Sequence, residues 1–145
     1  MNAIRRISSL SLFHRALLLD LSTCIPTAAL LIAGADALAP LTGLPVELLR
    51  YAGFVLVPFG VLLALTLSAA RPNKFAAWSI MEINLAWVVA SFYVLYGAGL
   101  QPTAAGSAVV IAQALGVLGI AALQFAGWRR LGTANDYTGS VAARA

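Results

Sequence analysis

Two carboxyl groups interrupt long apolar stretches of this 145-residue chain. Asp20 lies in the stretch 16–34 and Glu82 in the stretch 78–96. An ionisable side chain at membrane depth is costly, so by default it marks a functional site or has a specific internal partner. Such groups suit a proton relay, a cation site or the polar floor of a small-ligand pocket. The alternative is that they only hydrogen-bond one helix to another.

The two carboxyl groups are predicted to lie at similar depths. Asp20 lies about five residues into the first predicted helix and Glu82 about eight residues into the third, both counted from the same side of the membrane. Gln124 lies close to that side on the fourth helix. At 100° per residue, two threonines share the face of Asp20 and a tyrosine shares the face of Glu82. We therefore predict a ligand or proton site formed by Asp20, Glu82, Gln124, Thr23, Thr27 and Tyr93.

A second set of residues is predicted to pack helices together or to contact a partner. Asn84 lies roughly opposite Glu82 on its helix, so it is only a secondary candidate for the polar site. On the fourth helix, small residues recur every four positions, which permits the close approach of another helix. The set consists of Asn84, Trp87, Gln113, Ala108, Ala112 and Gly116.

Several kinds of chemistry are disfavoured by residue counts. The chain has one cysteine, Cys24, and one histidine, His14. An intrachain disulfide and a thiolate metal cluster are therefore excluded, and a multi-histidine haem or zinc site is not expected. No nucleophile lies beside a base, and no cofactor motif is present. We predict no catalytic residue, no metal and no cofactor.

Composition predicts an integral membrane protein. Hydrophobic residues make up 61% of the chain and charged residues 10%, whereas about a quarter of a soluble domain is charged. Four apolar segments, at about 14–35, 45–70, 75–97 and 103–128, match the length that crosses a bilayer. We predict an all-α protein with a four-helix transmembrane domain over residues 1–130, arranged as an antiparallel up-down bundle, and a flexible cytoplasmic tail over 131–145.

The distribution of basic residues predicts the orientation. Only Arg50 falls on the outer side, and the others fall on the inner side, which places both termini in the cytoplasm. A signal peptide ending at 37–39 is the alternative, but the first apolar segment is long for one and contains Asp20. The net charge of +4 then reflects topology, and no nucleic-acid partner is expected. The inner-side residues are Arg5, Arg6, Arg15, Arg71, Lys74, Arg129, Arg130 and Arg144.

Four short features together resemble a known group of proteins. They are an aspartate in the first helix, Gly-Leu-Pro at 43–45, the pattern Asn-x-x-Trp at 84–87 and Ala-Gln-Ala at 112–114. The chain resembles small bacterial four-helix integral membrane proteins that are functionally uncharacterised. The resemblance implies the topology and a multi-pass location in the bacterial inner membrane, and it supplies no activity.

Three functions follow from these features. We favour a protein that binds or transports a small molecule or ion through a polar site formed by Asp20 and Glu82 in the cytoplasmic half. The first alternative is a non-catalytic accessory or assembly subunit of a larger membrane complex, and the second is an intramembrane enzyme. The expected partners are the lipid bilayer, a second copy or a larger complex, and a small-molecule or lipid ligand.

Overall fold

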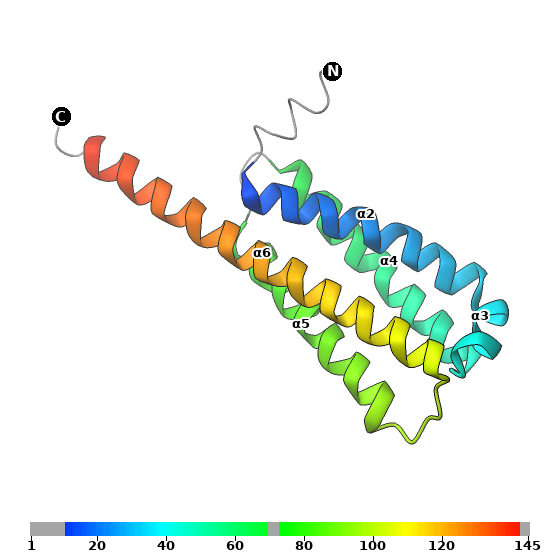
Figure 1. Cartoon of the computed structure of the whole chain (residues 1–145). Helices are drawn as coiled ribbons and strands as arrows, with labels where there is room; N and C mark the ends of the chain where they lie inside the picture. The colour runs from blue at the N-terminus through cyan, green and yellow to red at the C-terminus, as the bar shows by residue number, and fades with distance from the viewer. Residues whose placement is uncertain (1–10, 70–72, 143–145) are drawn as a thin grey trace, which may run out of the picture.

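The computed structural model describes residues 11–69 and 73–142, with side chains through residue 131. This part of the chain is entirely helical and contains no strand. Four of its helices are long and apolar enough to cross a membrane, which confirms the predicted all-α class and is consistent with a multi-pass membrane protein. The helices are α2 (Leu12–Ala33), α3 (Ala35–Thr42), α4 (Val46–Ser68), α5 (Lys74–Tyr96) and α6 (Ala104–Ala142) (Figure 1).

Helix ends follow from local capping groups. The Ser11 hydroxyl accepts a hydrogen bond from the His14 backbone N–H at the start of α2, and the Asn73 side chain accepts one from the Phe75 N–H at the start of α5. The Thr103 hydroxyl accepts one from the Gly106 N–H at the start of α6. Gly43, with φ of 69°, ends α3 in the left-handed conformation that favours glycine. The stretch between the first two predicted segments therefore contains a short helix that was not predicted.

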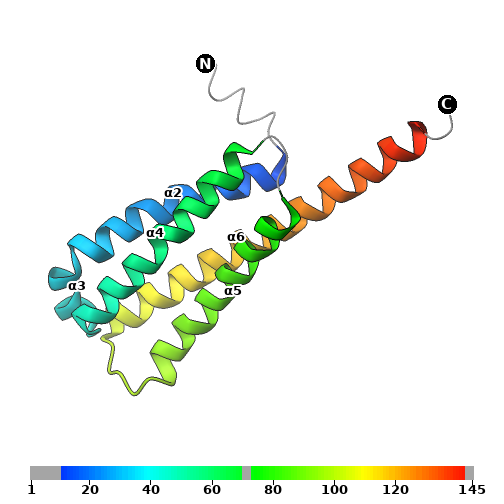
Figure 2. The ribbon, with the colours of Figure 1, turned by 180° about the vertical axis from the view of Figure 1, so that it is seen from behind.

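The long helices differ in how closely they pack. α2 lies beside both α4 and α6, and α5 lies beside α6 (Figures 1 and 2). α4 and α5 approach each other less closely. A Cβ at Gly127 of α6 would collide with the backbone of Phe13, so glycine at this position allows α2 and α6 to meet.

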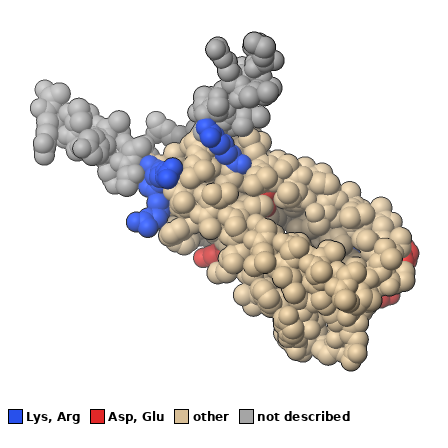
Figure 3. Space-filling view, viewed as in Figure 1, with Lys and Arg blue, Asp and Glu red and all other residues tan. Residues whose placement is uncertain are grey.

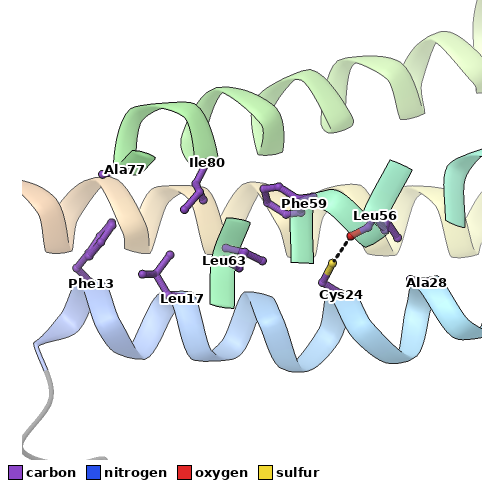
Figure 4. Close-up of a cluster of buried hydrophobic side chains, with 9 residues drawn as sticks. All are labelled: Phe13, Leu17, Cys24, Ala28, Leu56, Phe59, Leu63, Ala77 and Ile80. Carbon is purple, nitrogen blue, oxygen red and sulfur yellow. Dashed lines mark hydrogen bonds between the residues drawn. The ribbon is translucent and has the colours of Figure 1, made fainter. Parts of the chain in front are cut away.

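The main apolar core lies between α2, α4 and α5. Side chains from α2 point toward α4, and the Cys24 thiol donates a hydrogen bond to the Leu56 carbonyl oxygen at 3.4 Å (Figure 4). The edge of the Phe13 ring meets Trp128 at 5.5 Å between ring centroids, which adds α6 to this contact region. The core cluster consists of Phe13, Leu17, Cys24, Ala28, Leu56, Phe59, Leu63, Ala77 and Ile80.

Lys and Arg gather at the end of the molecule where α2 and α5 begin, which we call the basic end (Figure 3). Arg50 instead lies near the start of α4, at the opposite end of the molecule, and forms an ion pair with Asp36 of α3 at 2.6 Å. Four residues used for the topology prediction lie outside the described part of the chain: Arg5, Arg6, Arg71 and Arg144.

The last helix is longer than its predicted span. We expected a helix over 103–128 followed by a flexible tail over 131–145, whereas α6 remains helical to Ala142. Its apolar span ends at Leu131, so about 16 Å of helix extends past that span at 1.5 Å per residue. The sequence of α6 contains no proline, so no residue lacks the backbone N–H that continues the helix.

Candidate functional site

Three polar side chains from three helices meet in the interior. Asp20 of α2, Asn84 of α5 and Gln124 of α6 are 3%, 2% and 0% exposed. The Asn84 Nδ2 donates to Asp20 Oδ2 at 2.7 Å and to Gln124 Oε1 at 3.1 Å. The Gln124 Nε2 donates to the same Asp20 Oδ2 at 2.6 Å. We call this closed set of three hydrogen bonds the polar triangle.

The polar triangle uses only one of the two carboxyl oxygens of Asp20. Oδ2 accepts both amide hydrogen bonds, and no hydrogen bond reaches Oδ1. Among the described residues, every side-chain nitrogen or oxygen that is inaccessible to solvent has a hydrogen-bond partner. Oδ1 must therefore have access to open space, and by the same reasoning so must Oδ1 of Asn84. Both residues line a cavity that is open to the surface on part of its wall.

The cavity has a volume of about 210 Å³ and lies between α2, α4, α5 and α6. At about 30 Å³ for each water molecule in the liquid, it has room for roughly seven waters or a small organic molecule. Its polar atoms come mainly from α2 and α5, and apolar side chains form the remaining walls. The lining residues are Asp20, Thr23, Cys24, Thr27, Val55, Leu56, Phe59, Ile83, Asn84, Trp87, Gln113, Gly116, Val117 and Ile120.

A second set of hydrogen bonds holds the α5 and α6 sides of the cavity. The Trp87 indole Nε1 donates to Gln113 Oε1 at 3.4 Å, and the Gln113 Nε2 donates to Ser91 Oγ at 3.3 Å. The Ser91 hydroxyl donates to the Trp87 carbonyl oxygen at 2.8 Å. These contacts fix the Trp87 ring in the cavity wall and link it to α6.

Four residues of the predicted ligand or proton site lie together. Thr23 and Thr27 line the cavity with Asp20, and Gln124 contacts Asp20 through the polar triangle. Several residues that we predicted to be packing contacts also line the cavity. These are Asn84, Trp87, Gln113 and Gly116.

The structure does not bring Glu82 or Tyr93 to this site, because both are exposed on the outer surface of α5. The orientation of α5 is therefore opposite to the one we predicted for Glu82 and Asn84. The physical reason is that the buried Asp20 carboxyl needs hydrogen-bond donors, which an amide supplies and an ionised carboxylate lacks. The spacing of Ala77, Asn84 and Ser91, seven residues apart and all buried, is the sequence signal that identifies the inner face.

The small residues that we predicted to pack α6 against another helix do not lie at a contact between helices of this chain. Ala108, Ala112 and Gly116 are exposed, and a Cβ at Gly116 would meet no atom within 4 Å. Close contacts of α6 occur instead at Gly106 and Gly127. A contact of the small-residue positions with a partner stays a prediction.

Within the described residues, no three His, Cys, Asp or Glu side chains are placed to share a metal ion.

No known protein family, curated protein or solved structure matches this chain.

Proposed function

We propose that this chain is a bacterial inner-membrane protein that binds or transports a small molecule, and that the cavity beside Asp20 is its binding site. The observation that carries the proposal is Asp20, a residue that is 3% exposed, lines the cavity and receives no hydrogen bond at Oδ1. A carboxyl that served only to join helices would gain most by sharing both oxygens with protein donors.

The polar triangle supports this role because it holds the carboxyl in one orientation. Two amide groups fix Oδ2, so Oδ1 is directed to the cavity before any ligand binds. A group that is positioned in advance loses little conformational entropy on binding. Glu82 has no part in this site, so the proposal now rests on Asp20 with Asn84 and Gln124.

For the membrane arrangement, we propose an antiparallel up-down bundle with both termini in the cytoplasm. The support is the charge bias of the described residues, among which Arg15, Lys74, Arg129 and Arg130 belong to the basic end and Arg50 alone belongs to the other. Short basic segments are retained on the cytoplasmic side of bacterial membranes. The basic end would then face the cytoplasm, with Asp20 about 12 Å along α2 from that end.

Filling the cavity tests the proposal. Gly116 lines the cavity and Gly119 does not, and a Cβ at either position would meet no atom within 4 Å. Gly116→Leu should therefore fill the cavity, and Gly119→Leu is a matched control on the same helix. The probes are 2-phenylethylamine, 2-phenylethanol and phenylacetate, and the measurement is thermal unfolding of the purified protein in detergent.

We expect at least one probe to stabilise the wild-type protein and Gly119→Leu, and to leave Gly116→Leu unchanged. At a concentration ten times Kd, such a probe stabilises the folded state by about 1.4 kcal/mol. If no probe discriminates between the two leucine variants, the cavity is not a binding site and the proposal is refuted.

The outer face of α5 favours a second candidate, an accessory subunit of a larger membrane complex. Glu82 is exposed within an apolar span, and Trp78 and Tyr93 are exposed near it. A carboxyl that faces lipid is costly, so a partner that covers it would stabilise the protein. Under this proposal, Glu82→Leu abolishes co-purification of other subunits in mild detergent and leaves probe binding intact. Purification of the wild-type chain without other subunits would contradict it.

A further inference from the structure

The cavity differs from most polar sites in the balance of its hydrogen-bonding groups. Each nitrogen donor that lines it already has a protein acceptor: the Asn84 Nδ2 in the polar triangle, the Trp87 Nε1 on Gln113 and the Gln113 Nε2 on Ser91. The Cys24 thiol is also directed away, toward the Leu56 carbonyl oxygen. Each nitrogen and thiol donor group of the cavity wall therefore has at least one acceptor within the protein. Among the described residues, the second N–H of Gln113 and the Thr27 hydroxyl donate no hydrogen bond.

Two oxygen acceptors in the cavity wall, by contrast, have no donor within the protein. Oδ1 of Asp20 and Oδ1 of Asn84 have access to the cavity and receive no hydrogen bond from the protein. A ligand that pairs these two oxygens must bring donors. An ammonium group has three N–H donors and no acceptor, so it matches the wall, whereas a carboxylate has only acceptors and would face Asp20 with a like charge.

The charge of an Asp20 carboxylate also favours a ligand with an ammonium group. Both hydrogen-bond partners of the Asp20 side chain are neutral amides, so an ionised Asp20 would have no counter-charge in direct contact. An unpaired buried charge is strongly unfavourable, and a cation bound at Oδ1 would neutralise it. We infer that the ligand is an amphiphilic amine whose ammonium group binds Asp20 Oδ1 and whose apolar part contacts Phe59 and Trp87. This inference rests on the proposed function and specifies its ligand class.

The apolar part of the ligand follows from the walls and openings of the cavity. Phe59 and Trp87 offer aromatic surface, and an ammonium group near an aromatic ring gains further attraction. The lining residues Val55 and Ile83 are 56% and 37% exposed, so the wall reaches the lateral surface at α4 and α5. Figure 3 shows a hollow in the face formed by α2 and α6. Two lining residues on these helices, Thr23 and Gly116, are exposed. The cavity thus opens sideways within the apolar spans, and a lipid-soluble amine reaches it from the bilayer.

Affinity measurements with the same probe series test this inference. For the wild-type protein, we expect 2-phenylethylamine to bind about tenfold or more tightly than 2-phenylethanol, because a hydrogen bond to a charged group is stronger than a neutral one. Phenylacetate should bind most weakly. The trimethylated amine, which keeps the charge and lacks N–H donors, should fall between the amine and the alcohol.

Variants separate the ligand class from the existence of the site. Asp20→Asn should reduce the affinity for the amine to that for the alcohol, and Gly119→Leu should keep the wild-type order. If Asp20→Asn does not fold, the order of the four probes on the wild-type protein decides. Equal or tighter binding of the alcohol or of phenylacetate, abolished by Gly116→Leu, would overturn the amine class and leave the cavity as a site. Binding of no probe would instead refute the proposed function.

Discussion

Two substitutions on α5, two residues apart, should have effects of opposite sign. Asn84→Leu removes the donor of two hydrogen bonds in the polar triangle and leaves the buried Asp20 carboxyl with one amide partner. Glu82→Leu replaces an exposed carboxyl in an apolar span with an apolar side chain. The comparison tests which face of α5 is turned inward.

The expected magnitudes follow from the hydrogen bonds and the exposure. Hydrogen bonds between membrane helices contribute about 0.6 kcal/mol on average and about 1.7 kcal/mol at most. Loss of the two bonds from Asn84 should therefore lower the free energy of unfolding by about 1 to 3 kcal/mol. Glu82→Leu should leave it unchanged or raise it, with an upper limit of about 3 kcal/mol, the insertion cost of a charge at the centre of a membrane helix.

The measurement is reversible unfolding in mixed micelles, followed by tryptophan fluorescence. A double-mutant cycle of Asn84→Leu and Gln124→Leu should show a coupling energy of about 0.5 kcal/mol or more, because the two side chains share a hydrogen bond and a common acceptor. If Glu82→Leu destabilises the protein more than Asn84→Leu, α5 is rotated by about 200° from the orientation described, and the polar triangle is refuted.

Four further substitutions test contacts within and between helices in the same unfolding assay. Gly127→Ala should destabilise the protein by about 1 to 3 kcal/mol, because its Cβ would collide with the α2 backbone, whereas Gly119→Ala should stabilise it by up to about 1 kcal/mol through helix propensity. Equal effects of these two would contradict the close contact of α2 and α6. Thr103→Val removes the hydroxyl that caps α6 and contacts the Leu41 carbonyl oxygen, and it should cost about 0.5 to 2 kcal/mol. Arg50→Ala should change stability by less than about 1 kcal/mol, because its ion pair is exposed to solvent, and a larger effect would show that this pair is more than a surface contact.

The lengths of the membrane segments could be predicted from the sequence because they depend on composition alone. For the second and third segments, the predicted limits agree with α4 and α5 within two residues. The short helix α3 was missed because Pro40 and Gly43 are typical of turns, although proline is also tolerated near helix ends. The extension of α6 was missed because a polar composition indicates solvent exposure without excluding a helix.

The meeting of Asp20 and Gln124 could be predicted because both are polar interruptions at similar depth in otherwise apolar helices. The orientation of α5 was predicted wrongly, because Glu82 and Asn84 lie on opposite faces of a mostly apolar helix and the carboxyl was taken as the stronger sign of the inner face. The seven-residue spacing of Ala77, Asn84 and Ser91 favours the Asn84 face, and the need of Asp20 for donors, which is seen only when three helices are packed together, explains it. The openness of Oδ1 is likewise a property of the assembled cavity.

The sequence separation within the polar triangle has a consequence for biosynthesis. Asp20 precedes Asn84 by 64 residues and Gln124 by 104 residues. Since chains are made from the N-terminus, α2 is complete long before either amide partner has been synthesised. Until α5 and α6 have been made, the Asp20 carboxyl has neither amide partner and must be accommodated by water or by a proton. A chain truncated before α6 would keep the Asn84 donor and lose Gln124, so it would carry the Asp20 carboxyl with one of its two amide partners.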